Sequence, residues 1–262
     1  MTWTGGSFGS TGTCVLAPNA DVMTLDGTNT WVLREPGARR SVVVDPGPEV
    51  VEHLDAVAEV AGEVGVVLLT HGHADHSEAA RGFAERMRCG VRALDPQHRL
   101  GAEGLGGGDV VEVDGLEVRV VATPGHTSDS LSFVLPAEQA VLTGDTVLGR
   151  GTTVVAHPDG RLGAYLDSLR RLHALAEAQE VQVVWPGHGP VIADALAVLD
   201  HYLAHRAERL EQVREALRDL DLQRGDLARA VVEKVYVDVD PVLWGAAELS
   251  VRAQIDYLLG KG

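Results

Sequence analysis

The sequence predicts a layered α/β fold that carries a helical appendage. Short apolar runs rich in β-branched residues alternate with amphipathic helical patterns up to about residue 190. After Pro190 the pattern becomes helical throughout. With 262 residues, of which 45% are apolar, the chain is long enough for one large domain and a small appended one. Strands mixed with helices are typical of layered α/β proteins.

The predicted strands are short runs bounded by glycine and proline. They cover residues 30–35, 41–47, 64–70, 116–125, 131–136, 140–145 and 181–187. Helical patterns lie between some of them, at 48–62, 77–88 and 161–178. The glycine-rich segment 101–111 neither follows a strand nor opens a helix, so we expect a flexible surface connection and not a phosphate loop.

The appendage begins after the last predicted strand. Residues 193–220 predict a long amphipathic helix or a helix pair, because leucine and valine recur at helical spacing. Two further helices are expected at 225–236 and 249–262. We therefore predict one domain over residues 1–192 and a second, all-helical one over residues 193–262.

Composition and charge restrict the classes of function. A net charge of −16 argues against strong general affinity for nucleic acid. From His205 to the end, nine Lys/Arg stand against eleven Asp/Glu, so almost all of the negative charge lies in the first 204 residues. No run of about 18 apolar residues, no signal-peptide pattern and only two cysteines are present, so we expect a cytoplasmic protein that does not contact a membrane.

The stretch "LLTHGHADHSEAA", residues 68–80, places four potential metal ligands directly after a predicted strand. Neutral imidazole is the commonest side chain bound to metals, and carboxylate offers a hard, charged oxygen. These ligands are His71, His73, Asp75 and His76. A solvated loop is the alternative interpretation of this cluster.

Three more predicted strands each run into a potential ligand, namely His126, Asp145 and His188. In layered α/β proteins, sites gather where strand ends meet loops, so we expect all seven side chains to converge. One zinc ion usually takes four ligands, so seven suit two ions. Such a pair lowers the pKa of water to about 7 and makes it nucleophilic. The remaining histidines are expected to have no catalytic role: His53, His98, His157, His173, His201 and His205.

Five motifs together resemble the metallo-β-lactamase superfamily. "THGHADH", "TPGHT", "TGDT" and "PGHGP" occur in that family's order and spacing, and "VVVDPG" precedes them. The resemblance covers residues of about 12 to 192. It implies an αββα sandwich with a dinuclear metal site between two sheets.

The resemblance also implies a role for each ligand. His71, His73 and His126 would hold the first metal, Asp75, His76 and His188 the second, and Asp145 would bridge the two. Asp45 would lie behind the metals and orient ligand histidines. Asp75 would also steer the hydroxide and pass on its proton. Two zinc ions are expected, with iron or manganese as alternatives.

A narrower resemblance is to the beta-lactamase-like protein 2 group. It rests on "APNADVMTLDGTNTWVL", "HRAERLEQVREAL" and "VYVDVDPVLWGAAELSVRAQIDYLLGKG", and it implies a C-terminal winged-helix-like domain. The chain departs from the family in two ways. Ser130 stands where many relatives have histidine, and the chain stops at "LLGKG" so soon after its last helix that we expect no full β-wing.

Three functions remain open. The leading prediction is a dinuclear zinc hydrolase that cleaves phosphodiester bonds of single-stranded RNA with a metal-bridging hydroxide, as an endoribonuclease would. The alternative is a thioester hydrolase similar to glyoxalase II or to carrier-protein thioesterases, which the acidic sandwich favours because it repels RNA. A non-catalytic binding module is the third, and the intact ligand set argues against it.

Three further residues have two interpretations each. Arg206 and Arg209 would either meet a substrate phosphate or belong to a solvated helical face. Trp31, beside the turn "GTNT", would either border the site or lie in the core.

Overall fold

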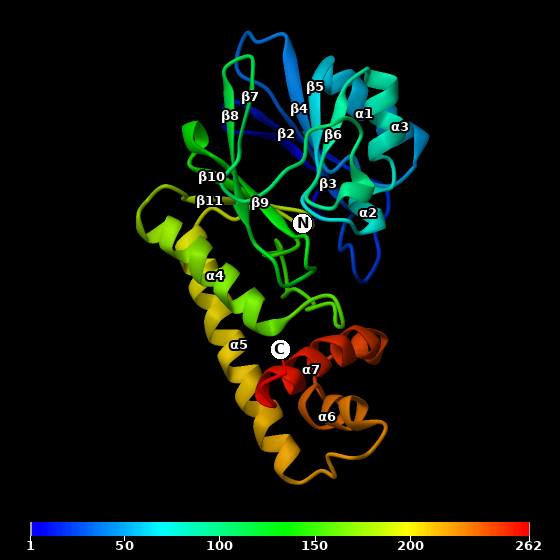
Figure 1. Cartoon of the computed structure of the whole chain (residues 1–262), viewed down its shortest axis with the longest axis vertical. Coiled ribbons are helices and arrows are strands. Elements are labelled where there is room, and N and C mark those ends of the chain that lie inside the picture. Colours follow the sequence, from blue (N-terminus) through cyan, green and yellow to red (C-terminus); the bar gives the residue numbers. More distant parts are fainter. Residues whose placement is uncertain (1, 262) are drawn as a thin grey trace.

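The computed structural model describes residues 2–261, arranged as two facing β-sheets flanked by helices, with a helical region at one end (Figure 1). Residues 1 and 262 lie outside the described part, and with them the outer ends of the predicted domains and of the helix predicted at 249–262. No helix within the described residues is long and apolar enough to cross a membrane.

The first sheet has six strands. Its order is β1 (Gly6–Phe8), β2 (Gly12–Leu16), β3 (Asn29–Leu33), β4 (Arg40–Val44), β5 (Glu63–Leu68) and β6 (Gly90–Arg92). Strands β1 to β4 pair antiparallel, whereas β4, β5 and β6 pair parallel. The carboxyl ends of β4 and β5 therefore lie at the same edge.

The second sheet has five strands. Its order is β11 (Val183–Pro186), β10 (Ala140–Gly144), β9 (Leu131–Leu135), β8 (Leu116–Ala122) and β7 (Val110–Val113). Among these strands β10 and β11 pair parallel and the rest antiparallel, so β10 and β11 both end at one edge of this sheet.

The main apolar core lies between the sheets. Alternate side chains of the strands point inward there, including Leu33, Val42 and Phe133. Trp31 is 2% exposed, and its ring stacks on that of Trp185 at 4.8 Å between centroids. Of its two interpretations, Trp31 thus belongs to the core.

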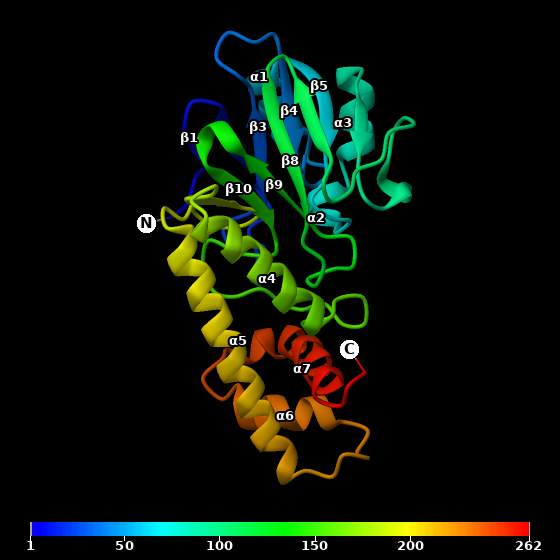
Figure 2. The same ribbon diagram turned by 60° about the vertical axis from the view of Figure 1, so that its left-hand side comes forward.

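Helices cover the outer faces of both sheets (Figure 2). The face of the first sheet packs against α1 (Val51–Ala61) and α3 (Ala80–Met87). The face of the second packs against α4 (Leu162–Glu177) and the first half of α5 (Ala195–Arg218). The predicted αββα sandwich is confirmed. The connections of the sandwich also contain the one-turn helices α2 (Ala74–Ser77), η1 (Pro96–His98) and η2 (Pro136–Glu138).

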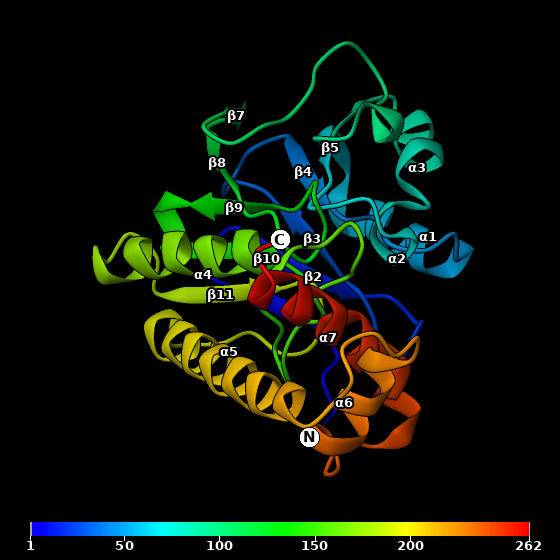
Figure 3. The same cartoon turned by 60° about the horizontal axis from the view of Figure 1, so that its bottom comes forward.

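The C-terminal helices form a small core of their own. The second half of α5 packs with α6 (Leu227–Val235) and α7 (Trp244–Leu258), as Figure 3 shows. Their shared core includes Val213, Val231 and Val251. The short helix η3 (Pro241–Leu243) precedes α7. Residues 193–261 contain no strand, so this part is helical and has no β-wing. The boundary at residue 192 stays a prediction, because Leu199 and Tyr202 of α5 belong to the core on the second sheet.

Several predicted elements differ from the structure. The helix expected at 77–88 corresponds to α3, the preceding one-turn helix α2 was not predicted, and the helix expected from residue 249 begins at Trp244. The region 193–220 is one helix and not a pair. Strands β1, β2, β6 and β7 were not predicted, and the end of segment 101–111, expected to be a flexible connection, already belongs to β7. All four of these strands are short, and each lies at or next to a sheet edge.

Candidate metal centre

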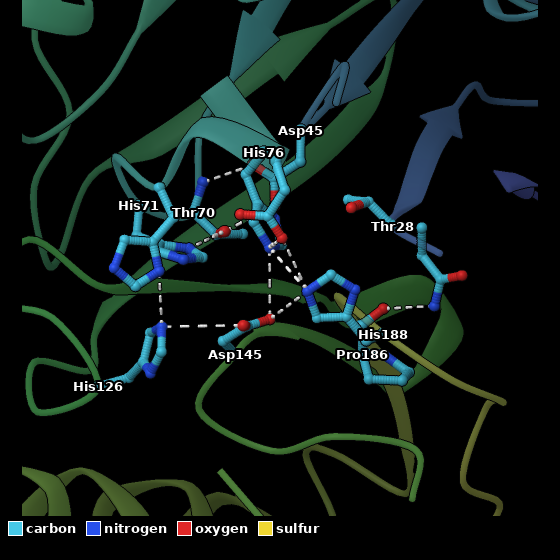
Figure 4. A network of polar contacts seen from close by, with 12 residues as sticks. Thr28, Asp45, Thr70, His71, His76, His126, Asp145, Pro186 and His188 are labelled. Carbon is cyan, nitrogen blue, oxygen red and sulfur yellow. Dashed lines mark hydrogen bonds and ion pairs between the residues drawn. The ribbon is translucent and has the colours of Figure 1, made fainter. Parts of the chain in front are cut away.

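The seven predicted ligands come together at one edge of the two sheets, and five of them are labelled in Figure 4, namely His71, His76, His126, Asp145 and His188. The loop after β5 and the one-turn helix α2 supply four of them. His126 follows β8, Asp145 follows β10 directly, and His188 lies two residues beyond β11. The strand ends therefore bring these seven side chains together.

His71, His73 and His126 form the first group, with ligand atoms within 4.8 Å of one another. His126 Nε2 lies 3.0 Å from His73 Nδ1. The other ring nitrogen of His126, Nδ1, is 2.6 Å from the carbonyl oxygen of Val154 and must donate to it. His126 is thus fixed with the lone pair of Nε2 turned toward the site.

Asp75, His76 and His188 form the second group. His188 Nε2 lies 3.1 Å from Asp75 Oδ2 and 3.2 Å from His76 Nε2. His188 Nδ1 donates to the carbonyl oxygen of Gly27 at 3.1 Å, so this ring too presents Nε2 to the centre.

Asp145 lies between the two groups. Its Oδ1 is 3.4 Å from His76 Nε2 and 3.5 Å from His188 Nε2. Its Oδ2 turns the other way and lies 3.8 Å from His126 Nε2. One carboxylate oxygen therefore faces each group, which is the arrangement a bridging ligand requires.

Asp45 lies behind the ligands, as its predicted role requires. Its Oδ2 accepts hydrogen bonds from His76 Nδ1 at 2.9 Å and from Thr70 Oγ1 at 2.6 Å, while Oδ1 accepts from the Thr70 backbone. Because the Thr70 hydroxyl donates to Asp45, it accepts from His71 Nδ1 at 3.0 Å. Asp45 thus orients His76 directly and His71 through Thr70.

The charges and the unpaired atoms of the site fit bound cations. The buried atoms His71 Nε2 and Asp145 Oδ1 have no hydrogen-bond partner among the described residues. Burial opposes charge on His188, but the carboxylates of Asp145 and Asp75 outweigh it and raise its pKa to about 9. The same competition between burial and the charges of Asp145 and Asp45 raises the pKa of His76. The carboxylates therefore require positive charge here, which divalent ions would supply in place of protons.

No loop-holding role was predicted from the sequence for Asn29 or Ser130. Asn29 Nδ2 donates to the carbonyl oxygens of Pro186 and Gly189, at 2.9 and 2.8 Å, and so fixes the loop that carries His188. Ser130, in place of the family histidine, holds the loop after His126, because its hydroxyl lies 2.7 Å from that of Thr127. The motif "GTNT" was the one signal that pointed to Asn29.

The other histidines do not belong to the ligand groups. Among the described residues, the groups able to hold an ion do not include His53, His98, His157, His173, His201 or His205. His157 and His173 pair with surface carboxylates. His53 is buried and lies 3.1 Å from the carbonyl oxygen of Pro46, next to Asp45.

Arg206 and Arg209 of α5 both pack against other parts of the chain. Arg206 is 4% exposed, donates to the carbonyl oxygen of Thr153 and lies over the ring of Tyr165. The interpretation of Arg206 as part of a solvated face is therefore wrong, because this side chain of α5 is buried against the sandwich. Arg209 donates to the carbonyl oxygen of Val235 and lies over the ring of Tyr236.

A cavity of about 340 Å³ opens beside the ligands. His126 and Asp145 form part of its wall, and the loop with Val22 and Met23 forms another part. The remaining wall comes from the segment 148–154 after β10, from α5, from the segment after α6, and from α7.

Residues 23–188 match the sequence profile of the metallo-beta-lactamase superfamily, and this range covers the sandwich from β3 to β11 and all seven ligands. The chain belongs to this superfamily of metal-dependent hydrolases. A solved structure of a metallo-beta-lactamase family protein from Thermus thermophilus shares the fold, with a TM-score of 0.76 at 22% identity, covering 95% of this chain and 93% of that one.

Two relatives extend the similarity beyond the sandwich. The chain is 33% identical over 232 residues to an atrochrysone carboxyl ACP thioesterase of Aspergillus chevalieri, covering 86% of this chain and 71% of the relative. It is 32% identical over 238 residues to a beta-lactamase-like protein 2 homologue of Caenorhabditis elegans, covering 86% and 76%. The resemblance to the latter group, noted from the sequence, is thus confirmed.

Proposed function

We propose that the protein is a thioester hydrolase that uses two zinc-like ions. The observation that carries the proposal is the pair of histidine and aspartate groups, joined by Asp145, at the wall of a largely apolar cavity. A metal centre that opens onto apolar surface suits the hydrolysis of an acyl compound.

The choice of a thioester over RNA rests on charge and on the relatives. The net charge of −16 opposes a polyanion, and Arg206 and Arg209 are already engaged with carbonyl oxygens and aromatic rings. Several relatives are carrier-protein thioesterases by name. Single-stranded RNA, the leading prediction from the sequence, has less support than the thioester alternative.

The ligand roles follow from the two groups. His71, His73 and His126 would hold one ion, Asp75, His76 and His188 would hold the other, and Asp145 lies between the two groups. When bound, such ions polarise a carbonyl group and generate a nucleophile from water at neutral pH. Asp45 and Thr70 fix the histidine rings so that little reorganisation is needed during the reaction.

Asp75 carries the proton. It is the most exposed of the three carboxylates at the centre, with 29% of its side chain accessible, so it can reach both water and substrate. Water adds to the acyl carbon and gives a proton to Asp75. The carbon–sulfur bond then breaks, and Asp75 returns the proton to the departing thiolate, so that a carboxylic acid and a thiol result.

The test compares two substrate classes with one preparation of protein. A panel of acyl thioesters and a labelled single-stranded RNA are each incubated with zinc-supplied protein and with chelator-treated protein. We expect zinc-dependent release of free thiol and no RNA cleavage. Zinc-dependent cleavage of RNA together with inert thioesters would overturn the proposal in favour of the phosphodiester reaction.

A further inference from the structure

The cavity beside the metal centre has walls from two parts of the chain. The sandwich contributes His126, Asp145 and Leu148, and the C-terminal helices contribute Leu243 and Ala246. The cavity is therefore continuous with the reacting centre, and the helical region closes it. A cavity of about 340 Å³ lies within the ordinary range for small-molecule sites.

About half of the lining residues are apolar, and they supply most of the accessible surface of the cavity. The loop after β2 supplies Val22 and Met23, which are 49% and 45% exposed although both are large and apolar. The segment between α6 and α7 supplies Val239 and Leu243. Exposed apolar side chains that gather around a cavity indicate a binding surface for an apolar group.

The arginines of the cavity are already paired. Arg150 forms an ion pair with Asp26 at 2.7 Å, and Arg206 and Arg209 donate to carbonyl oxygens while they lie over tyrosine rings. Burial, together with the charges of Arg206 and Arg209, lowers the pKa of His205 to about 4, so this histidine is neutral near pH 7. The three arginines are therefore part of the cavity wall. Because their guanidinium groups are engaged with other protein groups, they do not offer a free site for a phosphate group.

We propose that this cavity binds the acyl group of the substrate and selects thioesters of apolar acyl groups of medium size. The inference rests on the proposed thioester reaction and adds the substrate class to it. A methylene group is close in volume to a water molecule, about 30 Å³, so the cavity has room for an acyl chain on the order of ten carbon atoms.

The cavity suits the acyl side of the thioester better than the thiol side. When the carbonyl carbon of the thioester lies beside Asp145 and His126, its acyl chain and its thiol part must extend in different directions. The apolar one gains free energy by entering the cavity, whereas a carrier thiol such as phosphopantetheine is polar and anionic. The helical region therefore determines which acyl groups the protein prefers, while the thiol part of the substrate stays in the solvent.

The experiment fills the cavity with one extra ring. Ala246 of α7 lines the cavity and lies outside the buried core of the helical region, so Ala246→Phe narrows the cavity with little effect on folding. Ala207→Phe on α5 is the matched control, because Ala207 is exposed and does not line the cavity. Acetyl, hexanoyl and decanoyl thioesters of N-acetylcysteamine are compared, so that only the acyl group changes.

For the unaltered protein we expect kcat/KM to rise by about tenfold or more from acetyl to decanoyl. Ala246→Phe should lower the decanoyl value by about tenfold and the acetyl value much less, and Ala207→Phe should change neither. Equal losses at all chain lengths, or no rise with chain length, would overturn the inference while the thioester reaction stands.

A binding measurement keeps the two proposals separable. The ketone analogue of the decanoyl substrate, with a methylene between carbonyl and sulfur, cannot be hydrolysed. Calorimetry with chelator-treated protein should show that it binds, and that Ala246→Phe weakens binding whereas Ala207→Phe does not. If no thioester is hydrolysed, the proposed function fails. The titration then decides by itself whether the cavity binds an acyl chain. Equal binding by both variants would contradict an acyl site there.

Discussion

The hydroxyl of Thr70 connects two parts of the candidate site. It donates to Asp45 and accepts from His71, so a single oxygen transmits the position of a buried carboxylate to a ligand ring. A threonine at the end of an apolar strand looks like any other β-branched strand residue. The sequence therefore predicts the role of Asp45 by resemblance but gives no signal for Thr70.

Replacing Thr70 with valine tests this connection. The substitution keeps the shape of the side chain but removes the hydroxyl, so His71 loses its partner. We expect metal affinity, measured by competition with a chelating dye, to fall by about 10- to 100-fold. Thr70→Ser restores the hydroxyl and should recover most of the affinity. Equal affinities for all three proteins would contradict this role.

Asp145 is tested by truncating its side chain. Asp145→Ala removes the carboxylate that faces both histidine groups, so we expect thioester hydrolysis to fall by orders of magnitude and metal content to drop. Far-UV circular dichroism should show that the C-terminal helices remain folded. Asp167→Ala, on the exposed face of α4, is the control and should behave like the unaltered protein. Normal turnover by Asp145→Ala would exclude a bridging role.

At the scale of elements, the strand ends determine where the ligands meet. The strands that precede the ligands are runs of valine and leucine, so β5, β8, β10 and β11 were all predicted from sequence. Because the ends of these strands share one edge of the sandwich, the convergence of the ligands could be predicted as well. The detailed contacts could not, since they depend on loop conformations such as that of residues 187–189.

The missed elements have physical reasons. Strands β1 and β6 have only three residues each and begin with glycine, so they show no alternation that could be recognised. They exist because neighbouring strands pair with them. Helix α2 is separated from α3 because the ligand loop turns there to place Asp75 and His76 in the centre. Tertiary pairing in the first case, and the geometry of the site in the second, override the local pattern.

Gly187, directly after β11, tests the loop geometry. A Cβ at this position would lie 2.7 Å from Asp145 Oδ1 and 2.9 Å from His76 Cε1. Gly187→Ala should therefore displace a ligand and lower metal content and activity together. Gly82→Ala is the matched control, because a Cβ there meets nothing within 4 Å and alanine favours α3. Full metal content in Gly187→Ala would show that the loop yields without disturbing the ligands.

At the scale of the whole molecule, α5 joins the sandwich to the helical region. Its first half packs on the second sheet, and its second half forms the core with α6 and α7 (Figure 1). The hydroxyl of Tyr202 accepts a hydrogen bond from the backbone of Leu148, which lines the cavity. The sequence predicts an amphipathic helix here. It could not place the cavity, because residues from distant segments form its walls.

Removing the chain after residue 192 tests whether the helical region belongs to the site. The truncated protein loses Leu199 and Tyr202 from the core on the second sheet and exposes the apolar side chains they cover. It also loses one wall of the cavity, so we expect lower thermal stability and strongly impaired activity. A soluble, folded protein that ends near residue 192 and keeps full activity would contradict the assignment.

The most direct test of the whole account is a metal titration of thioester hydrolysis. Protein freed of metal with a chelator is supplied with increasing zinc, and thiol release is measured at each step. The account predicts no activity without metal and a rise that saturates at about two ions per chain, as expected for seven ligands in two groups. Activity that is independent of zinc, or a folded protein that binds no metal, would contradict it.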